Sequence, residues 1–147
     1  MERKQKLHAK CRELVLETIE NLKAEIIDCQ NTANDYGLAK DRYDSFRAQL
    51  LRKRDMFSQK LAKNNEQFSL LNRIDILKKQ SKVEIGALVI TKNQKFIISI
   101  SLGKIELDGE SYYAISPAVP IYKAIDGKRV GDEFEFNGQK NKILEIN

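Results

Sequence analysis

Helix-breaking residues are scarce in the first half of this sequence of 147 residues, which has only two prolines and seven glycines in all. Between Leu7 and Leu77 there is no proline, and the single glycine is Gly37. Because proline and glycine are the residues that most strongly interrupt helices, their absence permits long helices on either side of residue 37. We therefore expect two long helices joined near Gly37.

The chain also lacks long apolar runs. No run approaches the ~20 apolar residues that a transmembrane helix needs. The start, MERKQKLHAK, is not followed by the apolar region of a secretory signal. We therefore expect a cytoplasmic protein with no membrane contact.

Cysteine and histidine are too few to build a metal cluster or a disulfide framework. Cys11 and Cys29 are 18 residues apart on one predicted helix, hence roughly 27 Å apart by helical rise. This separation excludes an internal disulfide. His8 is the only histidine, and a place on a helix surface or in a helix seam is a simpler explanation for it than catalysis.

Apolar residues follow heptad spacing on both predicted helices. Spacings of four and three residues are typical of a coiled-coil seam rather than of the wider apolar face of a globular helix. The descending helix has Arg54 and Asn64 as polar interruptions. The ascending seam is Val15, Ile19, Leu22, Ile26, Cys29 and Ala33, and the descending seam is Leu50, Phe57, Leu61, Phe68 and Leu71.

The two seams match as an antiparallel hairpin. Pairing Ile26 with Leu50 and Ile19 with Phe57 gives one common midpoint at residue 38, beside Gly37. Val15 with Leu61 and His8 with Phe68 share this midpoint. A parallel dimeric coiled coil is the alternative, but it has no need of a glycine and a lapse in the seam at the centre of a mirror-related pattern. The sequence thus predicts a monomer with a hairpin over residues 1–79.

After Leu77 the pattern changes to the alternation of β-strands. Lys78–Lys82 is the polar joint, and residues 83–147 form a predicted second domain. Asp108-Gly109 and Asn137-Gly138 are typical of type I′ hairpin turns, and residues 120–125 of a short helix entered by proline. We expect an α+β fold with a small, mostly antiparallel sheet. Its strands are predicted at 87–91, 95–101, 104–107, 111–115, 132–136 and 139–146.

Positive charge is concentrated in the predicted hairpin. Residues 1–82 contain 18 Lys and Arg against 12 Asp and Glu, whereas residues 83–147 contain 8 against 9. Arg47, Arg52, Lys53 and Arg54 cluster below the turn, so an anionic partner such as a nucleic-acid strand is one interpretation and a solvated helix flank is the other. The second domain has no Cys, His or glycine-rich phosphate loop, so we expect a docking role there and no enzyme site.

The whole arrangement resembles the GreA/GreB transcription elongation factors, above all in Ile115–Glu133, which reads ISPAVPIYKAIDGKRVGDE. In that family the segment usually reads Ile-Ser-x-x-Ser-Pro-Ile-Ala-Arg-Ala-Leu-x-Gly-Lys-x-Val-Gly-Asp. The resemblance implies an FKBP-like second domain that docks on RNA polymerase through Val119, Pro120 and Ile121. Because Val119 stands where the family has serine, we expect a more apolar contact here.

At the hairpin tip the family carries an Asp and a Glu, three residues apart, that help to hold Mg²⁺ in the polymerase active site. Asp41 and Asp44 keep this spacing, and Asp35 is the alternative under a shifted alignment. Spacing of three residues puts both carboxylates on one helix face, and oxygen ligands suit a hard cation. The competing interpretation is that Asp41 and Asp44 cap the descending helix and complement its dipole.

The resemblance implies a factor that is not itself an enzyme. It would insert its hairpin into the secondary channel of RNA polymerase and stimulate cleavage of backtracked RNA. Its cofactor would be Mg²⁺ shared with the polymerase. Arg47, Arg52 and Lys53 would guide the nascent RNA 3′ end, and DNA would be met only through the polymerase. The alternatives are a channel regulator that does not promote cleavage and a coiled-coil adaptor unrelated to polymerase.

Overall fold

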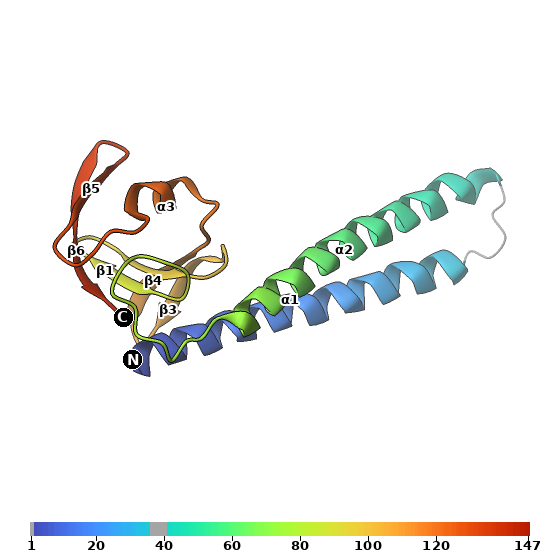
Figure 1. The fold of residues 1–147 in the computed structure, drawn as a ribbon. Helices are drawn as coiled ribbons and strands as arrows, with labels where there is room; N and C mark the ends of the chain where they lie inside the picture. The colour runs from blue at the N-terminus through green and yellow to red at the C-terminus, as the bar shows by residue number, and fades with distance from the viewer. Residues whose placement is uncertain (1, 36–40) are drawn as a thin grey trace. The chain divides into compact units, whose positions relative to one another are not determined.

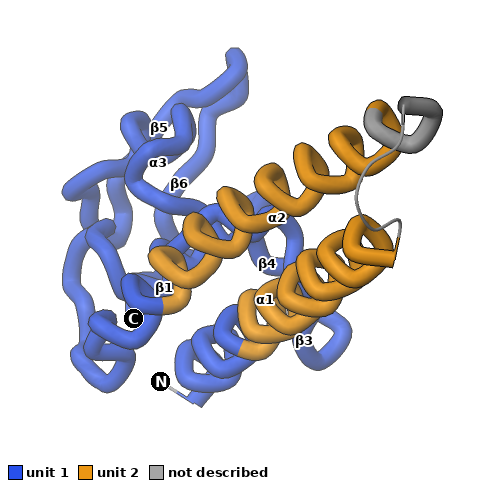
Figure 2. Tube along the Cα trace, turned by 90° about the vertical axis from the view of Figure 1, so that its right-hand side faces the viewer, with its two compact units in different colours: residues 1–12, 69–147 blue, residues 13–68 orange. Residues whose placement is uncertain are grey.

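The computed structural model describes the backbone of residues 2–35 and 41–147, and the side chains of residues 2–35 and 45–147. Its contacts divide the chain into two compact units, one of residues 1–12 with 69–147 and one of residues 13–68 (Figure 2). The predicted domains, 1–79 and 83–147, follow the change in sequence pattern, whereas these units follow packing. Residues 1–12 and 69–79 of the predicted hairpin are therefore grouped with the sheet.

Two long helices form the hairpin, α1 (Glu2–Asp35) and α2 (Asp41–Arg73), and they lie side by side in Figures 1 and 2. The midpoint between the end of α1 and the start of α2 is residue 38, as predicted. Gly37 lies outside the described residues. In the described part of the chain, neither helix has an apolar stretch long enough to cross a membrane.

All the predicted seam residues within unit 13–68 are buried or half-buried. Val15 and Ala33 are fully buried, and Ile19 and Cys29 nearly so. On α2 the shielded positions include the two polar interruptions, Arg54 and Asn64, so the heptad pattern continues through them. The half-buried seam residues are Leu22, Ile26, Leu50, Phe57, Leu61 and Phe68.

A six-stranded sheet follows, in the spatial order β3-β4-β2-β1-β6-β5. All neighbouring strands are antiparallel except β2 and β4, which are parallel. With the hairpin before it and one short helix within it, this confirms the predicted α+β fold class. The strands are β1 (Leu88–Thr91), β2 (Lys95–Ile98), β3 (Gly103–Leu107), β4 (Glu110–Ile115), β5 (Glu133–Phe136) and β6 (Gln139–Ile146).

Both predicted hairpin turns are confirmed. Asp108 and Gly109 have φ values of 52° and 80°, and Asn137 and Gly138 have φ values of 53° and 77°. Positive φ at both central residues is what a type I′ turn requires. The largest difference in strand length is at β2, which was predicted to reach residue 101 but ends at Ile98, because the chain bends at residues 99–100 on its way to β3.

Helix α3 (Pro120–Ile125) covers one face of the sheet. Tyr122 and Ile125 are its buried residues, and they join a cluster that draws on every strand except β3. Its other members are Val83, Ala87, Val89, Phe96, Ile98, Ile115, Phe134, Ile143 and Ile146.

The opposite face of the sheet is also buried, and the first turns of α1 lie in the same compact unit. Leu88, Ile97 and Tyr112 alternate with residues of the α3 face and are at most 1% exposed. Leu7 and Cys11 of α1 are fully buried. From the heptad pattern, the first turns of α1 were predicted to belong to the hairpin, so their place in the unit of the sheet was not predicted.

Lys4 is fully buried within this packing. Its Nζ donates a hydrogen bond of 2.8 Å to the carbonyl oxygen of Lys78. Burial lowers the pKa of Lys4, and the carboxylates of Asp75 and Glu84 act in the opposite direction. The buried ammonium thus links the start of α1 to the segment that follows α2.

The antiparallel register predicts that cysteines at Ile19 and Phe57 form a disulfide within one molecule. In a background with Cys11→Ala and Cys29→Ala, we expect oxidised I19C/F57C to run as a compact monomer on non-reducing gels. The matched control is E20C/S58C, which places both thiols at exposed positions one residue beyond the seam. Crosslinks only between molecules, confirmed by mass spectrometry of a mixed light and heavy sample, would establish the dimeric coiled coil instead.

The burial of Cys11 predicts a pH-dependent stability. Burial raises the pKa of this thiol from 9.0 to about 11, so the folded state keeps a proton that the unfolded chain loses above pH 9. The stabilisation is therefore complete below pH 9 and disappears as the pH rises to about 11. Two pH units correspond to about 3 kcal/mol.

Urea unfolding measured from pH 8 to 11 should show the wild type losing more stability than Cys11→Ala. The variant is less stable at pH 8, because it leaves a cavity, and the two curves should converge as the pH rises. Parallel curves would show that the thiol of Cys11 ionises as easily in the folded protein as in the unfolded chain.

Candidate functional site

The candidate site at the hairpin tip is framed by the two helix ends. α1 ends at Asp35, which is exposed, and α2 begins at Asp41. Asp44 is therefore in the first turn of α2, as predicted. The side chains of Asp41 and Asp44 lie outside the described residues.

The helix dipoles distinguish the three aspartates. A carboxylate is stabilised near the N-terminus of a helix and destabilised near its C-terminus. Asp41 and Asp44 are at the N-terminus of α2, whereas Asp35 is at the C-terminus of α1. Helix stability therefore accounts for Asp41 and Asp44 but not for Asp35.

The predicted basic cluster divides into two pairs. Arg47 Nε donates a hydrogen bond of 3.3 Å to the carbonyl oxygen of Ala33, near the end of α1. Arg54 donates through Nη1 to Gln30 Oε1 on α1, and its Nη2 lies 2.9 Å from the Asp55 carboxylate. These two arginines connect the helices across the seam.

Arg52 and Lys53 are exposed on α2, and the side chain of neither makes a hydrogen bond or ion pair within the described part of the chain. Of the three residues predicted to guide RNA, Arg52 and Lys53 are thus available to an anionic partner. Arg47 is shared with a structural contact. This difference could not be predicted from the sequence, because all three residues lie in one basic stretch.

Among the described residues, no three His, Cys, Asp or Glu side chains are grouped so that they could hold a metal ion. Asp41 and Asp44 are residue types with carboxylate oxygens, which are the ligands that Mg²⁺ prefers. Two carboxylates suit the usual pattern for Mg²⁺, in which a protein provides one or two and other groups complete the shell. The donor set therefore fits a shared ion.

The second part of the candidate site is α3 and the residue before it. Val119 occupies the N-cap position in an extended conformation, and Pro120 is the first helical residue. Proline suits this position because it has no N–H to leave unpaired and its φ is already helical. Pro120 is exposed, whereas Val119 and Ile121 are half-buried and packed against the α3-face core.

The end of α3 is fixed by two hydrogen bonds between Tyr122 and Asp126. The Tyr122 hydroxyl donates a hydrogen bond of 2.9 Å to Asp126 Oδ1, and the Asp126 N–H donates to the Tyr122 carbonyl. Burial, and then the hydrogen bond to Asp126, raise the pKa of Tyr122 to about 12. The phenol therefore remains a donor at neutral pH and fixes the end of the helix, while Gly127 continues the chain with φ of 70°.

A small cavity of about 140 Å³ lies beside α3. Its apolar wall consists of Ile121, Phe134 and Phe136, and the amides of Gln139 and Asn141 contribute to its polar wall. The predicted docking residues identified Ile121 but not its neighbours on β5 and β6. The residues on β5 and β6 were not predicted as its neighbours because they are more than ten residues from Ile121 in the sequence.

No protein-family model matches the sequence, and no curated protein matches it. Among solved structures, the chain is similar to GreA factor homolog 1 (Gfh1) of Thermus thermophilus, with 16% identity, a TM-score of 0.35, and 92% of this chain and 94% of that chain covered. It is also similar to Thermus aquaticus Gfh1, with 17% identity, a TM-score of 0.34, and 91% and 92% covered. TM-scores this low establish neither the family nor the function of this chain.

Proposed function

We propose that this protein is a Gre-like factor that inserts its α1–α2 hairpin into the secondary channel of RNA polymerase and stimulates cleavage of backtracked RNA. The main support for this proposal is the fold of residues 115–133, the segment that resembles the docking segment of the GreA/GreB factors. That segment forms a short helix entered by an exposed proline, on a chain that also has a long antiparallel hairpin.

The length of the hairpin supports a role in reaching a distant site. The 33 residues of α2 span roughly 50 Å at ~1.5 Å per residue. Bridging hydrogen bonds from Arg47 and Arg54 to α1 stiffen the pair of helices. A stiff rod can carry a pair of carboxylates into a narrow channel without losing much conformational entropy on binding.

At the tip, Asp41 and Asp44 would hold Mg²⁺ together with ligands from the polymerase, with Asp35 as the alternative ligand. Such an ion, when bound, lowers the pKa of its water and stabilises the charge that develops during phosphodiester hydrolysis. The contribution of this chain is to supply carboxylates and to keep them on one helix face. Bond breaking would remain the work of the polymerase, so the protein would not be an enzyme on its own.

Below the tip, Arg52 and Lys53 would attract the RNA 3′ end, and Arg47 would add to the field while bracing α1. Exposed cations that have no partner in the described chain can exchange their counterions for phosphates. This electrostatic contribution is independent of sequence and weakens with salt.

A second candidate is a secondary-channel regulator that occupies the same channel without promoting cleavage. The observation that favours it is the sequence Lys40-Asp41-Arg42, in which basic residues flank the first aspartate. Neighbouring positive charges weaken the attraction of a carboxylate for a cation. A transcript-cleavage assay on stalled complexes separates the two candidates. A pull-down of RNA polymerase separates both from an unrelated adaptor.

The metal role predicts a charge-specific loss of activity. Asn caps helices well but is a poor substitute for a carboxylate as a Mg²⁺ ligand, so Asp41→Asn with Asp44→Asn should leave folding and polymerase binding nearly unchanged. Cleavage of backtracked RNA should fall at least about a hundredfold, as loss of transition-state charge stabilisation predicts.

Raising Mg²⁺ should partly restore the single variants, each of which keeps one carboxylate, more than the double variant. The control is Asp55→Asn, which removes a carboxylate from the same helix away from the tip. If the double variant cleaves like the parent, Asp41 and Asp44 serve the helix alone.

The docking role predicts that Pro120 contributes to polymerase affinity. Pro120 is exposed, so Pro120→Ala should leave the fold intact and weaken binding about fivefold, the effect of a moderate interface contact. Pro120→Glu should weaken it further by placing a charge in an apolar contact. Ile121 is unsuitable for this test because it packs against the core.

Binding is measured by fluorescence anisotropy of labelled protein titrated with core polymerase, and Lys123→Ala is the matched control on the same helix. Equal affinities for the parent and both Pro120 variants would exclude the start of α3 as a docking contact.

A further inference from the structure

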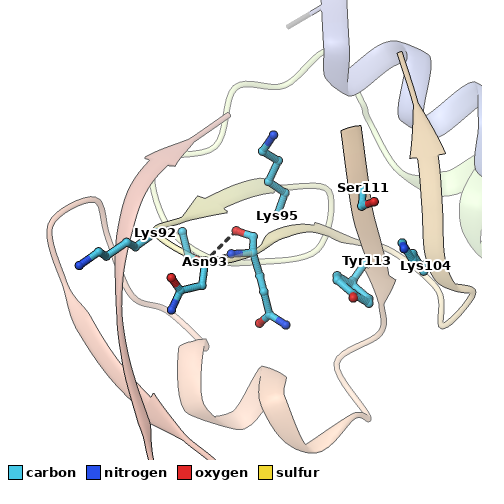
Figure 3. A pocket seen from close by; sticks show the side chains of 8 residues that line it. Lys92, Asn93, Lys95, Lys104, Ser111 and Tyr113 are labelled. Carbon is cyan, nitrogen blue, oxygen red and sulfur yellow. Dashed lines mark hydrogen bonds between the residues drawn. The ribbon is translucent and has the colours of Figure 1, made fainter. Parts of the chain in front are cut away.

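The small cavity beside α3 has a larger neighbour, a pocket of about 420 Å³ on the same face of the sheet (Figure 3). Gln94 lines both hollows. Phe134 of the small cavity belongs to the α3-face core, and Tyr113 of the larger pocket packs against that core. The two hollows therefore form one groove, here called the α3 groove, which runs from the β5–β6 hairpin past Gln94 to β3 and β4.

The lining of the α3 groove is free of negative charge. No Asp or Glu lines either hollow, whereas Lys92, Lys95 and Lys104 line the larger one. Residues 83–147 as a whole contain 8 Lys and Arg against 9 Asp and Glu, so this gathering of lysines does not reflect the average composition of the region. A lining with positive charge only favours an anionic partner.

Of the three lysines, Lys104 is the one placed to meet a partner inside the groove. Lys95 Nζ lies 3.1 Å from Glu110 Oε2, so its charge is already compensated. Figure 3 shows the ammonium of Lys92 pointing out of the pocket. Lys104 Nζ makes only a 3.8 Å contact with the exposed Glu106, and an exposed ion pair of this type is worth little.

Tyr113 supplies a second donor beside Lys104. The two residues are directly paired across β3 and β4, so their side chains share one face of the sheet, and they stand side by side in Figure 3. The Tyr113 ring is supported from the core side by Phe96, with 6.2 Å between the ring centroids. Its hydroxyl makes no hydrogen bond within the described part of the chain. One carboxylate has two oxygens and can therefore accept from both the ammonium and the phenol.

The small cavity at the other end of the groove is suited to an apolar side chain. Ile121, Phe134 and Phe136 form its apolar wall, and Ile121 and Phe136 are half-buried. Its volume is about 140 Å³. An apolar cavity of about 150 Å³ is large enough for one benzene ring. The small cavity therefore has room for one aromatic side chain.

The turn between β1 and β2 separates the two hollows and is firmly held. Thr91 Oγ1 donates to the Gln94 carbonyl at 2.7 Å and accepts from the Gln94 N–H at 3.0 Å. Asn141 Nδ2 donates to the same hydroxyl oxygen at 3.1 Å. The side-chain amide of Gln94 makes no hydrogen bond among the described residues, so it can both donate to and accept from a peptide backbone. A turn fixed in this way loses little entropy when a partner binds.

We propose that the α3 groove binds an extended, acidic segment of a partner protein, with an aromatic side chain in the small cavity and a nearby carboxylate on Lys104 and Tyr113. An extended segment suits two neighbouring hollows, because side chains two residues apart point to the same side at a spacing of roughly 7 Å. The inference goes beyond the proposed function, since it specifies a peptide chemistry that does not depend on polymerase. Ile121 is the one residue of the groove already assigned to docking.

The test titrates the full chain, labelled with ¹⁵N, with the blocked pentapeptide acetyl-EEFEE-amide. Acidic residues on both sides of the phenylalanine make the result independent of the direction in which the peptide lies. We expect saturable shifts of the Gln94 and Phe136 amide signals. The peptide EEAEE should bind at least about tenfold more weakly, as the burial of a phenylalanine side chain predicts. The peptide QQFQQ should bind about threefold more weakly at low salt, and this difference should shrink as salt is added.

The role of Lys104 is tested by Lys104→Gln, which should weaken EEFEE about threefold and leave the affinity for QQFQQ unchanged. Tyr113→Phe keeps the ring and should show a smaller loss of the same kind. The matched control is Lys140→Gln. Lys140 is exposed and lies between Gln139 and Asn141, which line the small cavity, so it points to the opposite face of β6.

The role of the small cavity is tested by Phe136→Ala, which should remove the preference for EEFEE over EEAEE. Circular dichroism checks that this variant remains folded. If it does not, the comparison of the two peptides on the parent protein decides the point, because it needs no change in the protein.

The proposal is overturned if EEFEE at millimolar concentration moves neither amide signal, or if EEFEE and EEAEE bind equally. It is also overturned if Lys104→Gln and Lys140→Gln weaken EEFEE by the same factor. Single-stranded hexauridylate that shifts the same amides at a higher affinity than EEFEE would assign the groove to nucleic acid instead. Because these titrations contain no polymerase, their outcome is separate from that of the cleavage and anisotropy assays.

Discussion

The sheet in this protein has two apolar faces, and both must be buried for the domain to be stable. Helix α3 is only six residues long and covers one face. A module of about 65 residues is close to the size at which a single core becomes marginal, so an uncovered second face could not be tolerated. Residues 1–12 and 69–81, which belong to the same compact unit, complete it.

This arrangement explains why a lysine can be fully buried. Lys4 lies where the start of α1 meets the segment after α2, and its ammonium satisfies the carbonyl of Lys78. A charged group is tolerated in such a place only when it is hydrogen-bonded and has opposite charges nearby, which Asp75 and Glu84 provide. The start of α1 and the end of α2 thereby belong to the same compact unit as α3. Helix α3, which is proposed to dock on the polymerase, and the base of the hairpin, which is proposed to enter its channel, therefore lie in one folded unit.

Local signals in the sequence were sufficient for most of the fold. Asp108-Gly109 and Asn137-Gly138 determine their own turns, because positive φ at two successive residues is a property of those few residues. Pro120 similarly marks the first residue of α3. The heptad spacing predicted the hairpin and its midpoint, because each seam needs only a partner of the same period.

The sequence could not show which partner each seam residue meets. Leu7 and Cys11 precede Val15 at intervals of four residues, whereas the predicted seam passed through His8, and both belong to the unit of the sheet. Apolar periodicity reports that a face is buried but not what buries it. The same limit applies to the basic stretch, where Arg47 and Arg54 bridge to α1 while Arg52 and Lys53 do not. Distinctions of this kind depend on contacts between segments far apart in the chain.

At the tip, Asp41 and Asp44 can cap α2 and bind a metal ion at the same time, because both roles need the ionised carboxylate. The N-terminus of α2 stabilises the ionised form of a nearby carboxylate, and the ionised form is the one that binds a cation. A carboxylate has two oxygens, so one can accept a backbone N–H while the other remains for a metal. Asp35, at the opposite pole of its helix, gains neither benefit from α1. The helix dipole therefore favours the pair on α2 as ligands for the same reason that it favours them as caps.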